Sequence, residues 1–415
     1  MANLPRAAFA ALLLAGVYAV ALVIGAFTLA IMALPLVGYV TLHNSFAGSL
    51  FISLAITVTI PGVTAVSQGV RAIRQIGEPW ESVPLPEAGT EPLRREIARI
   101  ARQTHTTAPL DLRLTPAANA GVREQARWLG LRGGTRTLYI GLPFLVGLSA
   151  GQLRAVLGHE MGHYAGGHAR ASVLVHRGLV TLAVIRAGFR ALRASRPAPG
   201  LRLLRPLALL TWAFLISYAT VGYAAFTGYE FVYQRLCFAM RRGQEYEADG
   251  YAEHIVGTAE LGATLRRTGA IGRAWQDFQA RFLAPMHAAG CTPDDVFDAF
   301  ARMLAADDYQ EVLKSFEEEQ VRKKTEPSDT HPCLADRLAR LRDGDPVPPP
   351  WAGGAPGRRP AAALIPVLPD RPWSATLSDT VKPHGAIASL PWDDCVRRVA
   401  QGRSLVLASD LLAAL

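Results

Sequence analysis

The chain has 415 residues, half of them hydrophobic and 19% charged, with a formal net charge of +9. This positive charge does not predict a nucleic-acid ligand, because only four lysines occur and no basic patch interleaved with aromatic residues is present. The excess of Arg and Ala is typical of a GC-rich bacterial genome. The four cysteines are far apart, so they predict neither a disulfide framework nor a metal-binding pair, in agreement with a reducing compartment.

The N-terminal region predicts membrane insertion. Residues 7–70 contain no Lys, Arg, Asp or Glu. Because about 20 apolar residues cross a bilayer, this domain, 1–70, has room for two transmembrane helices, near 10–40 and 46–68. A cleaved signal peptide would have an apolar core of only about 7–15 residues, so we do not expect one.

Residues 71–170 are expected to form the first part of a catalytic α+β domain. Helical spacing extends over 91–104, strands are indicated at 110–114 and 137–140, and 131–134 reads as a turn. We expect these strands to form a small antiparallel sheet. A strand beside the active-site helix could pair with an extended substrate, or could simply pack there.

The motif His159-Glu160-Met161-Gly162-His163 predicts a zinc site on a helix. Residues i and i+4 share one helix face, so His159 and His163 can bind one Zn²⁺. Glu160 is one step round the helix, where it can act as the general base that takes a proton from the attacking water. Ser149 and Gln152 have the spacing of a capping box, which predicts that the helix begins near residue 150.

A zinc peptidase needs a third protein ligand. The metzincin spacing would place a histidine at position 169, which is Ala169, and the neighbouring His168 is one residue out of register. The alternative is a carboxylate from a later helix. Glu245 and Asp249 are i and i+4, so one can bind zinc while the other accepts the second N–H of a ligand histidine.

A second, weaker pair of membrane segments is expected in 171–235. Residues 206–229 are uncharged, whereas 171–189 carries two arginines. The metal ligands on either side must meet, so the chain between them crosses the membrane twice or not at all. A hairpin would place the basic loop 190–205 on the far side, against the positive-inside rule, so a hairpin and a re-entrant segment both stay open. Arg71 and Arg74 predict a cytoplasmic catalytic site.

The remaining segments carry less chemistry. Residues 236–343 are mainly helical and are expected to complete the catalytic domain with the third ligand. Six prolines in 346–360 indicate a linker at 344–360, and the tail 361–415 receives no predicted role.

Four blocks together resemble a family, the integral-membrane zinc metallopeptidases that include HtpX-type proteases and CAAX prenyl proteases. They are Asn119-Ala120, the stretch 142–158 leading into the zinc motif, Glu245 to Asp249, and Thr330-His331-Pro332 with Arg337. The resemblance implies Glu245 as the third ligand, with Asp249 and Arg337 supporting the site. It also implies His331 as the group that stabilises the oxyanion and Asn119 as a substrate contact. The few predicted spans place the chain closer to the HtpX type.

The expected fold is a mainly α integral membrane protein. It comprises a zincin-like α+β catalytic domain with an active-site helix and a small antiparallel sheet, and about four membrane-associated helices. The expected function is zinc-dependent hydrolysis, with one Zn²⁺ per chain, of membrane-associated or misfolded proteins at the cytoplasmic face of the inner membrane. Protein substrates and the bilayer are the expected partners. Two alternatives stay open: a narrow processing protease for one membrane partner, and a catalytically silent membrane sensor or scaffold.

Overall fold

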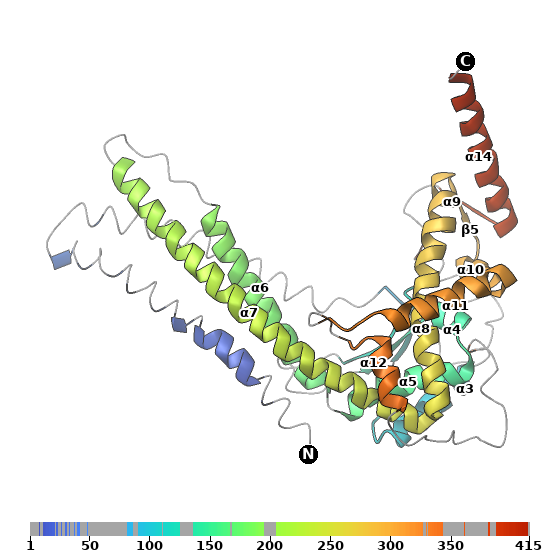
Figure 1. The fold of residues 1–415 in the computed structure, drawn as a ribbon, viewed down its shortest axis with the longest axis horizontal. Coiled ribbons are helices and arrows are strands. Elements are labelled where there is room, and N and C mark those ends of the chain that lie inside the picture. The colour runs from blue at the N-terminus through green and yellow to red at the C-terminus, as the bar shows by residue number, and fades with distance from the viewer. Residues whose placement is uncertain are drawn as a thin grey trace. The chain divides into compact units, whose positions relative to one another are not determined.

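The computed structural model (Figure 1) describes residues 11–20, 81–85, 90–109, 111–124, 136–166, 168–194, 205–326, 331–342 and 387–413, besides isolated positions elsewhere. The chain divides into two compact units, which we describe separately. The first comprises Met1–Glu78 and His168–Arg241, and the second comprises Pro79–Gly167 and Arg242–Leu415.

The first unit is helical. Its main elements are α6 (His168–Arg193) and the N-terminal part of α7 (Arg205–Val256). The two helices pack through a shared apolar core that includes Phe189 of α6 and Phe226 of α7, whose rings stack 5.8 Å apart. The Tyr233 hydroxyl donates to the Val175 carbonyl at 3.2 Å and ties the helices together further along.

Membrane crossing is not confirmed by the described residues. Among their helices, none combines the length and the apolar composition that a bilayer span requires. The predicted span near 46–68 lies almost wholly outside the described residues, and that near 10–40 lies partly outside them. The predicted segments 171–189 and 206–229 fall on α6 and α7.

The second unit contains a four-stranded sheet of order β1-β2-β4-β3, formed by β1 (Val83–Pro84), β2 (Asp111–Thr115), β3 (Ala120–Glu124) and β4 (Arg136–Gly141). The prediction of an antiparallel sheet was wrong in one pairing: β2 and β4 are parallel. β3 returns antiparallel to β4 and takes the outer place beyond it. β4 therefore lies between β2 and β3. The short connection from Thr115 to Ala120 makes β3 run opposite to β2, so β4, antiparallel to β3, runs in the same direction as β2.

The helices of this unit build most of its core. They are α3 (Glu91–Gln103), α4 (Leu142–Gly147), α5 (Ala150–Ala165), the C-terminal part of α7, α8 (Thr258–Phe278), a π-helical turn (Gln279–Leu283), α9 (Ala284–Ala288), α10 (Val296–Ala305), α11 (Asp307–Arg322) and α12 (Leu334–Arg342). The predicted helix at 91–104 and the strands at 110–114 and 137–140 are confirmed as α3, β2 and β4. The predicted turn at 131–134 and the linker at 344–360 lie outside the described residues.

The C-terminal tail packs against the rest of the second unit. Its strand β6 (Ala388–Leu390) pairs in parallel with β5 (Cys291–Pro293) and leads into α14 (Trp392–Ala413). The Trp392 ring lies 6.1 Å from that of Phe278 and 5.8 Å from that of Phe282. This part of the tail is thus an integral piece of the fold, which its mixed composition did not predict.

Candidate metal centre

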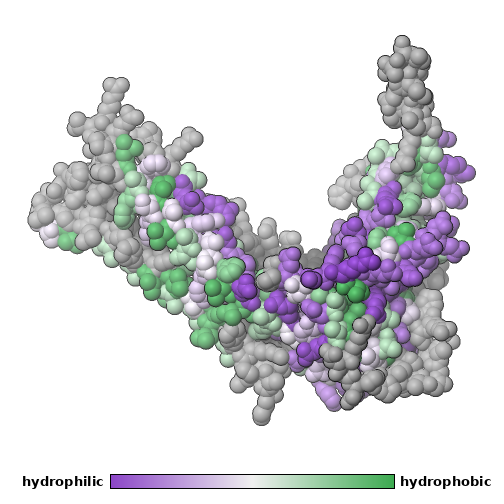
Figure 2. Space-filling view, in the orientation of Figure 1, coloured by the Kyte–Doolittle hydropathy of each residue, from purple (hydrophilic) through white to green (hydrophobic). Residues whose placement is uncertain are grey.

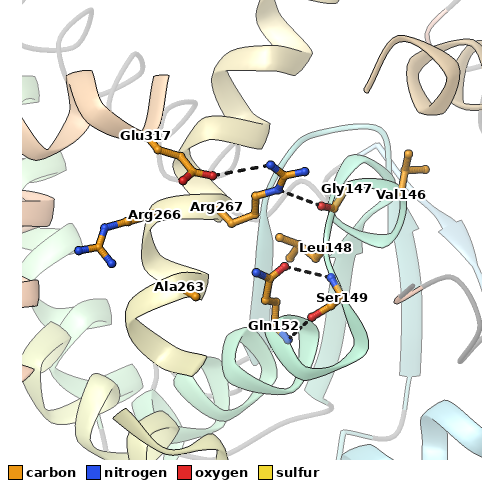
Figure 3. A pocket seen from close by; sticks show the side chains of 9 residues that line it. All are labelled: Val146, Gly147, Leu148, Ser149, Gln152, Ala263, Arg266, Arg267 and Glu317. Carbon is orange, nitrogen blue, oxygen red and sulfur yellow. Dashed lines mark hydrogen bonds and ion pairs between the residues drawn. The ribbon is translucent and has the colours of Figure 1, made fainter. Parts of the chain in front are cut away.

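The active-site helix α5 begins at a capping box. The Ser149 hydroxyl accepts the Gln152 N–H at 3.1 Å, and the Gln152 side chain accepts the Ser149 N–H at 3.0 Å, as the sequence predicts. Arg267 of α8 reaches across to this corner (Figure 3), where it donates to the Gly147 carbonyl at 3.4 Å and lies 3.7 Å from the Glu317 carboxylate. The start of α5 is therefore fixed both by its own cap and by α8.

A cavity at this corner lies apart from the candidate metal ligands. It measures about 600 Å³ and is lined by Val146, Gly147, Leu148, Ser149, Gln152, Ala263, Arg266, Arg267 and Glu317. None of the predicted site residues lines it. Its Ser149, Gln152, Arg267 and Glu317 side chains bond within the protein, so we assign this corner a structural role (Figure 3).

The predicted metal ligands come together in the second unit. His159 and His163 on α5 present their Nε2 atoms 3.2 Å apart. The Glu245 carboxylate, on α7, lies 3.4 Å from the Nε2 of His159 and 3.5 Å from that of His163. These three side chains form a group that could hold a metal ion.

The spacing of these donors fits zinc. Four-coordinate zinc with bonds of about 2.0–2.1 Å to nitrogen and oxygen places neighbouring donors roughly 3.3 Å apart, close to the distances observed. The charges fit as well. Burial disfavours the charged forms of both Glu245 and His159. Hydrogen bonds from His159 and His331 nevertheless hold the pKa of Glu245 well below its usual range. The pKa of His159 rises to about 9 because Asp249 and Glu245 outweigh its burial. The site therefore favours a positive charge between these side chains, which a metal ion can supply.

Asp249 and Arg337 orient the first ligand. Asp249, one turn after Glu245 and only 3% exposed, accepts the His159 Nδ1–H at 3.0 Å. That bond leaves the Nε2 lone pair of His159 directed at the metal site. Arg337 of α12 in turn binds Asp249 through two nitrogens, with Nε to Oδ2 at 2.8 Å. Burial raises the pKa of Asp249, but this guanidinium and His159 more than offset it and keep the carboxylate ionised.

Two glycines let α5 and α7 approach closely enough for Glu245 to reach the histidines. A Cβ at Gly162 would lie 3.0 Å from the Cα of Ala248 and 3.0 Å from the Cβ of Tyr251. A Cβ at Gly158, one turn earlier, would lie 3.3 Å from the Cα of Ala252. These two glycines, each directly before a ligand histidine, thus have a packing role that the zinc motif alone does not reveal.

Glu160 lies beside the ligands and next to the edge of the sheet. Burial raises the pKa of Glu160 to about 7, and the nearby Glu245 charge adds to this effect while His159 opposes it. A hydrogen bond from the Val122 backbone N–H lowers the pKa of Glu160. A carboxyl group with a pKa near neutrality can both accept and return a proton at physiological pH.

Val122 shows which side of β3 faces the candidate site. Its N–H bonds to Glu160, whereas the neighbouring Asn119 carbonyl accepts from Gly141 at the end of β4. Backbone groups alternate in direction along a strand, so the even-numbered residues of β3 direct their N–H and C=O groups away from β4. β3 is an outer strand among the described residues, and its outer edge runs beside α5.

His331 and Asn119 also border the site. The His331 Nδ1 lies 2.9 Å from the Glu245 carboxylate, and its side chain is 68% exposed. Asn119 is exposed, and its side-chain oxygen accepts the Ala120 N–H at 2.9 Å, at the start of β3. Both side chains line the catalytic cavity, whereas His168 begins α6 and belongs to the other unit.

The catalytic cavity measures about 200 Å³ and is lined by Asn119, Ala120, Phe144, Ala155, Val156, His159, Glu160, Glu245, Leu261, Thr264, Leu265, Thr268, His331 and Arg337. Sequence reasoning did not identify its α8 wall. The helical periodicity of 258–278 predicts a buried face but cannot say that this face borders the metal ligands.

Comparison with known proteins identifies the family. Residues 128–344, just over half of the chain, match peptidase family M48. The chain belongs to peptidase family M48. Its members are zinc metallopeptidases, the class that the zinc motif predicted.

Other comparisons of the M48 chain are more distant. Among solved structures it is similar to the crystal structure of S. mikatae Ste24p, with 15% sequence identity and a TM-score of 0.34, over 74% of this chain and 65% of that one. The chain thus spans less than two thirds of that relative's length. No curated protein matches it.

Proposed function

We propose that this M48 peptidase is membrane-anchored and cleaves membrane-associated or misfolded proteins at the cytoplasmic face. The observation that carries the catalytic part is the placement of Glu160 beside a His159–His163–Glu245 group whose donor atoms are spaced as zinc requires. A zinc ion held there would polarise the scissile carbonyl and lower the pKa of water towards about 7.

The residues of the chain divide the remaining work. Glu160 takes the proton of the attacking water on its carboxylate and returns it to the leaving amine. His331, which lines the same cavity, would donate a hydrogen bond to the negative charge that develops on the former carbonyl oxygen. The outer edge of β3 can pair with the extended substrate backbone, with Asn119 at its entrance, which would give cleavage with weak sequence dependence.

The surface of the first unit supports the anchoring. On α7 it exposes large apolar side chains, among them Phe214, Val221 and Phe231, which are 47%, 70% and 60% exposed (green in Figure 2). Arg186, which weakened the prediction for 171–189, forms an ion pair with Glu230 of α7. Pairing lowers the cost of placing an arginine in a bilayer. Such an anchor would raise the effective concentration of membrane-bound substrates at the site.

The catalytic proposal is tested with detergent-purified wild type and Glu160→Gln, side by side. We expect about one zinc per chain in both, and cleavage of an unfolded protein to fall roughly 10²–10⁴-fold in the variant, because glutamine cannot carry the proton. Full cleavage by Glu160→Gln would show that another group is the base. Zinc in both without cleavage by either would favour a narrow processing protease, and absence of zinc would favour a silent sensor or scaffold.

Anchoring needs its own measurement. After cell fractionation, we expect the chain to stay with membranes through an alkaline carbonate wash, which releases peripheral proteins. Release by the wash would overturn the anchoring proposal without affecting the assignment of the base.

A further inference from the structure

His331 lies on the segment that joins α11 to α12, and burial does not fix its position. Its side chain is 68% exposed, and its Nδ1 lies 2.9 Å from the Glu245 carboxylate. An exposed side chain keeps much of its conformational freedom unless the backbone that carries it is fixed. The placement of His331 at the cavity therefore depends on what holds the chain on either side of it.

Thr325 joins the two ends of this segment through its hydroxyl group. The hydroxyl donates to the Asp336 carboxylate at 2.6 Å and accepts the Cys333 N–H at 2.7 Å. Thr325 comes shortly after the end of α11, whereas Cys333 directly precedes α12 and Asp336 lies in its first turn. The hydroxyl thus acts as donor and acceptor towards the start of α12 and closes residues 325–333 into a loop, the His331 loop.

Little backbone freedom is left between this closure and His331. Pro332 alone separates His331 from Cys333, whose N–H Thr325 holds. The proline ring fixes the φ angle of Pro332 at about −65° and restricts the residue before it to extended conformations. A fixed Cys333 N–H therefore limits the directions in which the His331 side chain can leave the backbone.

The His331 loop is also tied to the helix that carries the third candidate ligand. Arg242 of α7 donates to the Asp329 carbonyl at 3.0 Å. Asp329 is held in a turn, because its carboxylate accepts the Glu326 N–H at 2.8 Å and its own N–H donates to the Glu326 carbonyl at 3.0 Å. Arg242 lies about one helical turn before Glu245, so the loop and this ligand are fixed to the same part of α7.

Accurate placement matters for the chemistry proposed for His331. A hydrogen-bond donor stabilises an oxyanion when it is already directed at the position that the oxygen takes in the transition state. A misplacement of about 1 Å can cost roughly 10²-fold in rate. The closure at Thr325 holds the chain two residues from His331, so its loss would permit displacements of this kind.

We propose that Thr325 is a positioning residue of this peptidase, which closes the His331 loop at Cys333 and Asp336 so that His331 can donate to the oxyanion. Thr325 does not line the catalytic cavity and acts through His331. This inference rests on the oxyanion role proposed for His331. It assigns a function to a residue that lies outside the zinc motif, the Glu245–Asp249 pair and the His331-Pro332 motif.

A second route from Thr325 to the site has to be separated from this one. The Cys333 carbonyl accepts the Arg337 N–H at 3.2 Å, and Arg337 binds Asp249 beside the ligands. A disturbance that follows this route would weaken zinc binding. A disturbance that acts through His331 would leave zinc affinity unchanged and lower the rate of the chemical step, so zinc affinity and kcat together distinguish the two routes.

The experiment uses zinc-loaded full-length protein and a quenched fluorescent peptide that spans a bond cleaved in the unfolded protein. Thr325→Val keeps the size of the side chain but removes the hydroxyl. We expect kcat to fall about tenfold, with KM changed less than about twofold and zinc affinity unchanged. Thr325→Ser restores the hydroxyl and should recover most of the rate. Ser315→Ala is the matched control, since it removes an exposed hydroxyl that donates within α11 to the Val312 carbonyl, and it should cleave like wild type.

A double-mutant cycle then tests whether Thr325 acts through His331. Removal of one oxyanion donor costs about 10²–10³-fold in kcat, and we expect a loss of this order for His331→Ala. Thr325→Val should cause no further loss in that background, because no imidazole is left to position. Asp336→Ala removes the exposed partner of the Thr325 hydroxyl and should show the same non-additivity, which keeps the test decisive if Thr325→Val does not fold.

The outcomes separate this inference from the function on which it rests. Wild-type kcat in both Thr325→Val and Asp336→Ala, equal losses with and without the His331 imidazole, or weaker zinc binding in Thr325→Val would overturn it and leave the peptidase function intact. Wild-type cleavage by His331→Ala would overturn the oxyanion role and this inference together, without affecting Glu160 as the base. If zinc-loaded wild type cleaved neither the peptide nor the unfolded protein, the proposed function would be wrong and this inference with it.

Discussion

At the scale of single residues, the candidate ligands are held by side chains outside the ligand group. Asp249 joins the His159 ring to Arg337, so it fixes both the orientation of the imidazole and the nitrogen that carries the proton. Partners of this kind are responsible for a substantial part of metal affinity in other proteins.

We therefore expect Asp249→Asn to weaken zinc binding by about 10–100-fold, because an amide no longer accepts the His159 proton as strongly and no longer pairs with Arg337. Competition with a chromophoric chelator would measure this affinity. Glu247→Gln, which changes an acid of the same helical turn outside the ligand group, should bind zinc like wild type. Equal affinities for all three proteins would show that Asp249 has no part in the site.

At the scale of elements, the contact between α5 and α7 decides whether the ligands meet. Gly162→Ala would introduce a methyl group 3.0 Å from the backbone of α7 and push the two helices apart. We expect a loss of about 1–3 kcal/mol in the free energy of unfolding, together with weaker zinc binding, because Glu245 moves with α7.

Gly250→Ala is the control for that substitution. Gly250 is exposed in α7, with no atom within 4 Å of its Cβ position, so alanine there should be neutral or stabilise by about 0.5–1 kcal/mol. Chemical denaturation followed by circular dichroism would compare the two variants. Equal stability of both would contradict the close contact between the helices.

A half-buried ion-pair cluster ties α3 to α5. Glu96 accepts from Arg154 at 2.8 Å and from Arg99 at 2.6 Å. Burial raises the pKa of Glu96, but the two arginines outweigh this effect and leave it lowered. A carboxyl group whose pKa is lower in the folded state stabilises the fold above its unfolded pKa of about 4.3, and this contribution disappears as the pH falls through the folded value.

Glu96→Gln should accordingly cost about 1 kcal/mol of unfolding free energy at pH 7, and the difference from wild type should shrink as the pH falls below about 4.3. Urea denaturation at a series of pH values would measure it. A difference that stays constant down to pH 3 would mean that the charge of Glu96 is not what stabilises this contact.

At the scale of the whole molecule, local features were predictable and non-local ones were not. The sequence predicts the start of α5 because Ser149 and Gln152 act within one turn. It does not predict that β2 and β4 are parallel, since this follows from the outer position of β3. The zinc motif and the later Glu245–Asp249 pair together predict that distant residues meet. No local pattern predicts that Leu261 and Leu265 line the same cavity.

The docked tail gives a prediction at this scale. Trp392 stacks against Phe278 and contacts Phe282 at a tilt, and β6 pairs with β5. Trp392→Ala should release this contact, so the amide hydrogens of Cys291, Thr292 and residues 388–390 should exchange faster in the full-length protein, while zinc content stays unchanged. Exchange at wild-type rates would show that the strand pairing holds the tail without the indole.

The close contact of α5 with α7 also bears on protein design. Within residues 158–163, the two histidines and Glu160 face the candidate metal site. Gly158 and Gly162 face the neighbouring helix, and Met161 faces the core. A designer who grafts only the two histidines and the glutamate onto a new scaffold would omit the surface that lets a second helix deliver its carboxylate. The unit to transfer is therefore a pair of helices in close contact at two glycines. The pentapeptide 159–163 belongs to one of these helices, and the carboxylate belongs to the other.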